Sequence, residues 1–284
     1  MYRKSVSNPL ELPQVLKSRP WFMRIRPLWL REKPFWKIYW KHTNKFIDLF
    51  EDASLEFAPK HSLRLMLTDV SHQQIALLGF CELSLSRRMV QLAKMGGLMV
   101  DVGANYGYYS CLWATANPKN QVVAFEASPR NLSALQHNLN KNKLETQVEI
   151  RQTAVGKESG SLPFTLGPEE QSGWGGLLAV KEEGTVKVTV VPLDEILLKG
   201  QDKLINVLKI DTEGADTWVL QGAEQLLRSH KIHHIFFEEN ITCMSALGIK
   251  PGEAQALLQD CGYCIQRLGS GEWYANTGQK PGQS

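Results

Sequence analysis

The sequence predicts an α/β fold built on a doubly wound, mostly parallel sheet. From residue 96 onward, runs rich in Val, Ile and Phe alternate with helix-like segments, which is the pattern of βαβ units. Several of these runs are apolar along their length, as expected for strands covered on both faces. With 284 residues, 43% of them hydrophobic, the chain can bury a full core.

Residues 1–60 are expected to form a basic, aromatic extension. Five prolines interrupt residues 1–34, so continuous helix is not expected there. The first 45 residues hold eleven Lys/Arg, two Asp/Glu and four of the eight tryptophans. Residues 35–50 read as an amphipathic helix with apolar or aromatic positions at helical spacing: Phe35, Tyr39, His42, Phe46 and Leu49. This spacing favours packing on the main domain, and the Arg/Lys–Trp mixture leaves open a peripheral membrane or partner surface over residues 17–45.

A hairpin and a helix are expected over residues 61–95, leading into the main domain. LEFAPKHSLRLMLTD (55–69) and HQQIALLGF (72–80) read as its two strands. Residues 84–95 read as a helix that ends at the following pair of glycines.

The main domain is expected over residues 96–276, with a flexible tail over 277–284. Its expected parallel strands are LMVDV, QVVAFEA, QVEIRQTAV, INVLKID and IHHIFFEE. Ser128 and Pro129 suit the N-cap and first turn of the helix after the second strand. CIQRL and EWYA suggest an antiparallel closing hairpin, and the insert at 160–191 adds strands at an edge or over the site.

Polar side chains follow each expected strand, and most of them are acidic. Ligands of open α/β sheets bind at the carboxyl ends of the strands, near the point where strand order reverses. The residues that follow the five strands are Asp101 with Gly103, Asn105 and Gly107; Glu126; Gln152 to Ala154; Asp211 with Glu213; and Glu238 with Glu239.

The first glycine turn distinguishes between nucleotide ligands. It reads G-A-N-Y-G rather than G-x-G-x-x-G, and Asp101 before it would repel a diphosphate but attract a cation such as S-adenosylmethionine. Glu126 lies 23 residues beyond Gly103, where an acid reaches ribose hydroxyls. No GxxxxGK[ST] motif occurs in the chain. S-adenosylmethionine is therefore the expected ligand, and a helix-capping role for Asp101 stays open.

At this point the sequence resembles the FkbM-type S-adenosylmethionine-dependent methyltransferases. Over residues 65–270 the resemblance rests on TDVSHQQIALLGFCE, VDVGANYGYYS, VVAFEASPRNLSALQHNLNKN, TAVG, SGWGGL, VPLDEIL, LKIDTEGAD and FFEEN, in that order. The stretch KID-x-EGA is the most specific of these, and Thr212 stands where the family usually has an aliphatic residue. The first 60 residues fall outside the resemblance.

The resemblance implies a class I methyltransferase, Rossmann-like fold. It also implies O-methylation of a hydroxyl on a sugar, a glycolipid or another natural product. The cofactor residues that it implies are Asp101, Gly103, Asn105 and Gly107 around the methionine part, Glu126 with Ala127 at the ribose, and Gln152 and Ala154 near the adenine.

O-methylation needs an aligned acceptor and a base that takes the hydroxyl proton. Asp211 and Glu238, at neighbouring strand ends, are the candidate bases, and a helix-capping role for Asp211 stays open. No His accompanies them, so no metal is expected. Glu82, Trp174 and Glu213 are candidate acceptor contacts. Surface exposure of Glu82, an ordinary edge loop around Trp174 and backbone capping by Glu213 are the alternatives.

Two other functions remain open. A nucleic-acid methyltransferase would use the basic extension, but the chain lacks an NPPY-like motif, and with a total charge of +3 and a surplus of nine in the first 45 residues the remainder carries −6. A non-catalytic binding module on the same scaffold is the second alternative. The five cysteines are scattered, and no run approaches the length of a membrane span. A cytoplasmic location is expected, with membrane association left open, and the acceptor is not identifiable.

Overall fold

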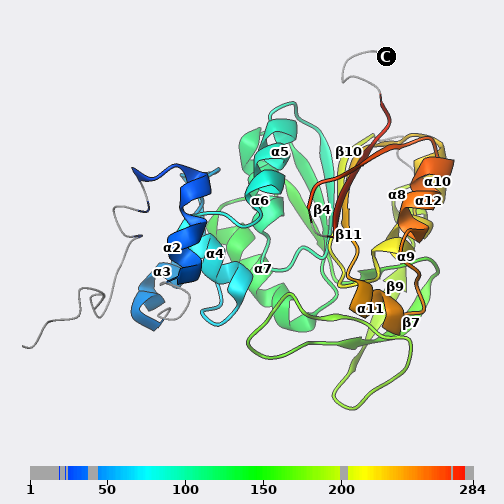
Figure 1. Cartoon of the computed structure of the whole chain (residues 1–284), viewed down its shortest axis with the longest axis horizontal. Coiled ribbons are helices and arrows are strands. Elements are labelled where there is room, and N and C mark those ends of the chain that lie inside the picture. Colours follow the sequence, from blue (N-terminus) through cyan, green and yellow to red (C-terminus); the bar gives the residue numbers. More distant parts are fainter. Residues whose placement is uncertain are drawn as a thin grey trace, which may run out of the picture.

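In the computed structural model, a seven-stranded sheet forms the centre of the protein (Figure 1). The structure describes residues 19, 23, 25–37, 44–198, 204–269 and 271–278. The strands lie in the order β12-β13-β11-β10-β3-β4-β5. In that order their bounds are Cys264–Arg267, Glu272–Asn276, Ile232–Glu238, Ile205–Ile210, Leu98–Val102, Gln121–Phe125 and Val148–Arg151.

Neighbouring strands from β5 to β11 pair in parallel, and β13 pairs antiparallel with both β11 and β12. The predicted doubly wound sheet and its antiparallel closing hairpin are therefore confirmed. The chain runs outward from β3 on one side and from β10 on the other, so strand order reverses between these two strands. This reversal places the ligand-binding edge at the carboxyl ends of β3 and β10.

Helices cover both faces of the sheet (Figure 1). One face carries α5, α6 and α7, with bounds Leu83–Ala93, Tyr108–Ala116 and Pro129–Lys141. The other face carries α8, α9, α10 and α12, with bounds Leu193–Leu197, Asp216–Gln221, Glu224–Arg228 and Glu253–Asp260. A short helix, α11, spans Ile241–Ala246.

The insert after β5 forms a second sheet of its own. Its four strands lie in the order β6-β9-β7-β8, with bounds Ala154–Val155, Val186–Val191, Gly160–Thr165 and Gly176–Leu177. The expectation that this insert adds strands is confirmed. The segment between β7 and β8 is the glycine-rich stretch that contains Trp174.

The segment expected to be the second strand of the early hairpin is helical. Residues 72–80 lie mostly in α4 (Val70–Leu78), whose N-cap residue Asp69 accepts a hydrogen bond from the His72 N–H at 3.0 Å. Gly79 ends the helix in the left-handed conformation. The strand prediction was wrong because the run was buried on most sides, so its hydrophobicity carried no clear period. The hairpin that does form is short, pairing β1 (Ala53–Ser54) with β2 (Ser62–Leu63).

The single helix expected over residues 35–50 is also not observed in that form. The described residues show a 3-10 turn, η1 (Leu28–Leu30), then α2 (Glu32–Lys37) and later α3 (Ile47–Glu51). Tyr39 and His42 lie outside the described residues. Phe35, Phe46 and Leu49 are buried, so these three positions pack as their spacing indicated.

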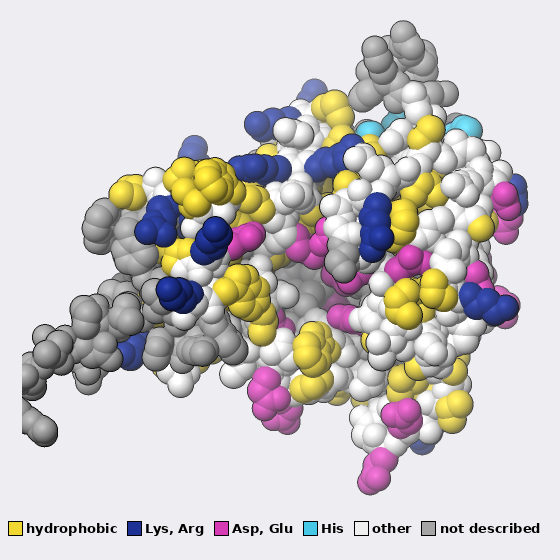
Figure 2. All heavy atoms as spheres, in the orientation of Figure 1, with side chains coloured by type: hydrophobic (Ala, Val, Ile, Leu, Met, Phe, Trp, Pro, Cys, Tyr) yellow, Lys and Arg dark blue, Asp and Glu magenta, His cyan; other side chains and the backbone are white. Residues whose placement is uncertain are grey.

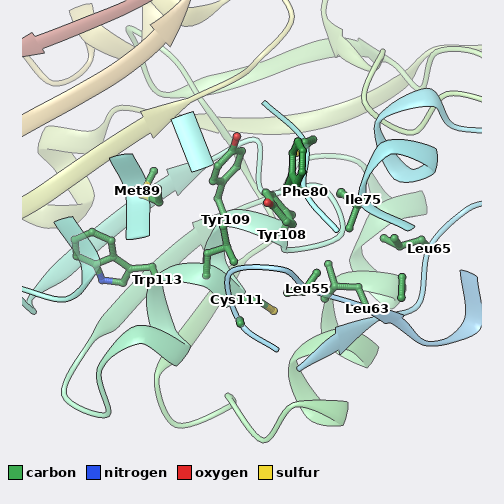
Figure 3. Packing of buried hydrophobic residues seen from close by; sticks show 14 of the residues in the cluster. Leu55, Leu63, Leu65, Ile75, Phe80, Met89, Tyr108, Tyr109, Cys111 and Trp113 are labelled. Carbon is green, nitrogen blue, oxygen red and sulfur yellow. The ribbon is translucent and has the colours of Figure 1, made fainter. Parts of the chain in front are cut away.

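The extension and the main domain share one hydrophobic core. Figure 3 shows residues of the early segment, including Leu55 and Phe80, packed near Tyr108 and Cys111 of α6. Met23 and Phe35, both fully buried, belong to the same cluster. The early residues therefore complete the core of the main domain instead of forming a separate one.

Candidate active site

Gly103 shapes the turn that follows β3. Its φ is +79°, and a Cβ at this position would lie 1.9 Å from the carbonyl oxygen of Asp211, so only glycine fits. Asn105 is left-handed as well, with φ of 50°, and Gly107 precedes α6 with φ of 88°. This turn brings the end of β3 directly against the end of β10.

Glu126 links this turn to the end of β4. Its Oε2 accepts a hydrogen bond from the Asn105 N–H at 2.7 Å, and its Oε1 accepts one from the Ser128 N–H at 2.8 Å. The residue is 5% exposed. Desolvation raises the pKa of Glu126 to about 7, although both N–H donors favour the ionised form.

A cavity of about 600 Å³ opens beside Glu126. The residues that line it include Gly103, Asn105, Glu126, Ala127, Thr153, Ala154, Leu177 and Asp211. We call it the first cavity. Gln152 is exposed and does not line it, because the residue that faces the cavity after β5 is Thr153.

Asp101 lies behind the first cavity rather than in it. The residue is fully buried, and its Oδ2 accepts a hydrogen bond from Ser110 Oγ at 2.6 Å. Its Oδ1 has no hydrogen-bond partner among the described residues and lies 3.9 Å from Lys209 Nζ. A direct contact between Asp101 and a bound ligand, as expected from the sequence, does not fit this position.

Lys209 is a buried cation between strand-end acids. Its Nζ lies 3.1 Å from Asp211 Oδ2 and 5.2 Å from the centre of the Tyr109 ring. Burial alone would lower the pKa of Lys209, but Asp211, Asp101 and Glu82 outweigh that effect and raise it. Lys209 therefore stays charged and holds one oxygen of Asp211.

A second cavity, of about 980 Å³, is bordered by acidic residues. Glu82, Asp211, Glu213 and Glu238 line it, and Figure 2 shows Asp and Glu side chains around the central hollow of this face. Lys209 is the only Lys or Arg among the described residues that line either cavity. This lining attracts neutral or positively charged groups and repels anions.

Burial raises the pKa of three glutamates that line the second cavity, Glu82, Glu213 and Glu238. Desolvation, with Asp211 as the next largest cause, raises the pKa of Glu213 and of Glu238 to about 7 each. Desolvation and then Asp211 also raise the pKa of Glu82, whose carboxylate accepts a hydrogen bond from the Tyr109 hydroxyl. Glu213 accepts a hydrogen bond from Asn240 Nδ2 at 2.9 Å, whereas no hydrogen bond to the Glu238 carboxylate is found among the described residues.

The two cavities meet at four residues. Gly103, Asn105, Gly173 and Asp211 line both of them. The Asp211 side chain is 44% exposed, so one of its oxygens remains accessible while Lys209 holds the other. A ligand in either cavity would therefore lie beside Asp211.

Residues 166–175, which we call the strap, cross over this junction. Ser172 donates to Asp69 Oδ2 through its N–H at 2.7 Å and through its Oγ at 3.0 Å. Asn131 Nδ2 donates to the Ser172 carbonyl at 3.0 Å. Trp174, near the end of the strap, is 60% exposed and lines the second cavity. The strap is thus held at Ser172, and Trp174 projects from it.

Sequence reasoning missed Lys209, Tyr109 and Asp69. The signal for Lys209 was present, because a lysine inside an apolar strand is rarely buried without an acidic partner. Asp69 could also have been recognised, because Asp is a common N-cap residue and Asp69 directly precedes α4, where it accepts a hydrogen bond from the His72 N–H. Tyr109 gave no signal, because only the fold brings α6 against Glu82.

No group of three or more His, Cys, Asp or Glu side chains in the described part of the chain has the arrangement of a metal site. Within the same residues, no helix is long and apolar enough to cross a membrane.

Comparison with known families identifies one that covers most of this site. The profile of the Methyltransferase FkbM domain matches residues 101–265, more than half of the chain. This span contains both glycines of the first turn and the stretch from Lys209 to Glu213.

Curated relatives share part of the sequence. The chain is 29% identical over 143 residues to the hexuronic acid methyltransferase AglP of Haloferax volcanii, covering 50% of this chain and 56% of AglP. It is 28% identical over 202 residues to methyltransferase sdnD of Sordaria araneosa, covering 60% of this chain and 74% of sdnD. The aligned region thus spans little more than half the length of AglP.

Among solved structures, methyltransferase FkbM from Methylobacillus flagellatus matches with a TM-score of 0.44 and 16% identity. That match covers 80% of this chain and 56% of the other.

Proposed function

Since the chain belongs to the methyltransferase FkbM family and is an S-adenosylmethionine-dependent methyltransferase, we propose that it methylates a hydroxyl of a sugar, glycolipid or natural-product small molecule. The observation that carries this proposal is the junction of two cavities at Asp211. One cavity suits the donor and the other the acceptor. A donor and an acceptor bound in them would have their reacting ends together.

The residues around the first cavity fit S-adenosylmethionine. Glu126 presents a carboxylate for ribose hydroxyls, and Ala127, Thr153 and Ala154 line the remainder with small side chains. Gly103 lets a ligand approach the backbone closely. The positive end of the donor would meet Asp211, whose carboxylate is accessible, while Asp101 acts indirectly by stabilising Lys209 and the turn.

When bound, S-adenosylmethionine supplies an electrophilic methyl group on a sulfonium. The chain must then remove the proton of the acceptor hydroxyl, and Glu238 is the best base for this step. Its pKa of about 7 matches the working pH of a general base, and its carboxylate is open to the second cavity. Asp211, whose Oδ2 accepts a hydrogen bond from Lys209 Nζ at 3.1 Å, is assigned to anchoring and orientation in this proposal.

The remaining residues around the acceptor have supporting roles in this proposal. Glu82 and Glu213 would hydrogen-bond acceptor hydroxyls. Trp174 would stack on the acceptor ring and help to exclude water. AglP is a hexuronic acid methyltransferase by name, which is consistent with a sugar acceptor here. The acidic lining of the second cavity favours a neutral or cationic sugar unit over a uronate.

Neither alternative function has a specific observation in its favour. Acidic side chains around the second cavity would repel the phosphates of a nucleic acid. A binding module without activity would not require an accessible carboxyl with a pKa near neutrality in the second cavity.

Calorimetry with S-adenosylhomocysteine tests the donor assignment without any acceptor. Wild-type protein is expected to bind it in the micromolar range or more tightly. Asp211→Asn should weaken binding markedly, because the ligand's ammonium loses a charged partner. Absence of binding by the wild type at millimolar ligand would overturn the proposed function. A screen with isotope-labelled donor against sugars, glycolipids and polyketide-like alcohols then identifies the acceptor.

A further inference from the structure

The early part of the chain exposes large apolar side chains next to one another in sequence. Ile25 is 71% exposed, Trp29 62% and Trp36 48%. Three tryptophans are strongly exposed among the described residues, and two of them lie in this short segment. Exposed tryptophan is unusual on a soluble surface and commonly marks a binding site.

Basic side chains are interleaved with these apolar ones. Arg26, Lys33 and Lys37 are exposed, and Glu32 is only partly so. Trp29, Lys33 and Trp36 are spaced by four and three residues, which places them on one side of the η1–α2 segment. In Figure 2, hydrophobic and Lys/Arg side chains lie side by side over the region of α2 in Figure 1. We call Ile25, Arg26, Trp29, Lys33, Trp36 and Lys37 the α2 surface.

The opposite side of the same segment is firmly attached to the core. Phe35 is fully buried, and Arg31 is 4% exposed. Arg31 pairs with Glu56 at 2.7 Å and donates to the Leu78 carbonyl at the end of α4 at 3.2 Å. The buried side explains the packing signal in the sequence, so the exposed tryptophans need a separate explanation.

We propose that the α2 surface docks onto an anionic lipid bilayer. Tryptophan favours the interface of a bilayer, and each Lys or Arg near an anionic leaflet adds attraction. A protein partner is the other outcome of the test, because tryptophan and arginine are enriched in protein–protein interfaces, whereas lysine is depleted. Charge complementarity favours the anionic bilayer, because Arg26, Lys33 and Lys37 are exposed while the acidic Glu32 is only partly so.

The α2 surface lies one helix away from the second cavity. On one side α4 packs against α2, and on the other it lines the cavity with Ser71, Gln74 and Ile75. Docking would therefore hold the acceptor cavity near the bilayer. This part of the inference rests on the proposed function, and it selects a membrane-borne glycolipid from the proposed acceptor classes.

Vesicle sedimentation of the full chain tests the docking. The probes are phosphatidylcholine vesicles with and without a phosphatidylserine fraction. Three basic residues at about 1 kcal/mol each predict binding to the anionic vesicles that is on the order of 100-fold tighter than to neutral ones. Trp29→Ala/Trp36→Ala and Lys33→Glu/Lys37→Glu should each weaken binding to anionic vesicles by at least about tenfold.

Trp174→Ala is the matched control, because it removes a tryptophan of similar exposure outside the α2 surface. It should leave vesicle binding unchanged. The two double variants should bind S-adenosylhomocysteine as the wild type does, which shows that they are folded. The proposal is overturned if the wild type sediments with neither vesicle, or if the α2 variants bind as tightly as the wild type. Loss of S-adenosylhomocysteine binding by the wild type would instead count against the proposed function alone.

Discussion

Residue-scale electrostatics guide which carboxyl of the site we propose as the base. Asp211 and Glu238 lie at the ends of adjacent strands, and spacing in the sequence does not distinguish them. Their surroundings differ, because Lys209 Nζ lies 3.1 Å from Asp211 Oδ2, whereas desolvation raises the pKa of Glu238 to about 7. We therefore propose Glu238 as the base.

Glu238 should give the reaction its pH dependence. A base must be deprotonated to act, so activity should rise with pH through about 7, the pKa of Glu238. Glu238→Gln should lower kcat by roughly 10²–10⁴-fold and remove this rise. The check is a pH profile of initial rates once an acceptor is found, with calorimetry to show unchanged donor binding. A Glu238→Gln enzyme with wild-type rates would transfer the role of base to another carboxyl.

Lys209 should control donor binding through the charge of its acidic neighbours. Carboxyls that face its Nζ come from several elements: Asp101 on β3, Asp211 after β10 and Glu82 before α5. Without the lysine, Asp101 and Glu82 would take up protons at higher pH, because Lys209 lowers the pKa of both. Lys209→Met should therefore shift the acidic limb of S-adenosylhomocysteine affinity to higher pH, and Lys209→Arg should largely restore it.

Calorimetry across pH measures this shift. A variant that was only misfolded would lose affinity at every pH and would not be rescued by arginine. If Lys209→Met follows the wild-type pH profile, Lys209 does not position these acids.

Element-scale order at the site depends on the strap. Asp69 performs two tasks at once, since its Oδ1 caps α4 and its Oδ2 accepts two hydrogen bonds from Ser172. The Asp69 carboxylate therefore joins the helix that lines the second cavity to the strap, together with weaker contacts of Val70 with Gln171 and of His72 with Ser172. Removal of the Asp69 carboxylate should therefore make the walls of both cavities less ordered.

Asp69→Ala should destabilise the protein by about 1–2 kcal/mol, the usual cost of losing an N-cap, and should weaken S-adenosylhomocysteine binding. Ser172→Ala is the matched control for the strap, because it keeps the backbone donor and the cap. It removes the hydrogen bonds of the Ser172 Oγ with Asp69 and Asn105, so it should cost some stability, but less than Asp69→Ala. Denaturant unfolding and limited proteolysis near residues 166–175 measure the two effects. Equal stability of Asp69→Ala and the wild type would contradict this account.

At the scale of the whole molecule, the sheet was predictable and some side-chain placements were not. Runs of Val, Ile and Phe and the residues that end them gave the strands, because the rule of alternating strands and helices leaves few arrangements. Helix α4 was misread because burial on most sides removed the period from its sequence. The prediction of Gln152 was wrong by one residue. Side chains of an extended segment alternate between faces, and Thr153 is the one that faces the first cavity.

The position of Asp101 needed the fold. Sequence alone placed it at a strand end, but not behind Lys209 and Ser110, which come from different elements. The exposed side of the extension was likewise not predictable from the sequence, because the same segment buries Phe35 and exposes Trp36 one residue later. Helical spacing predicted the buried side of this segment but gave no information about its exposed side.

The position of α4 between the α2 surface and the second cavity has a consequence for how an acceptor is found. If the α2 surface docks on a bilayer, the second cavity stays close to the membrane. The enzyme would then meet a membrane-borne acceptor by lateral diffusion in two dimensions rather than by collision in bulk solution. Its rate would then follow the surface density of acceptor in the membrane. Dilution of the acceptor with inert lipid would slow methylation even at a constant total amount in the assay.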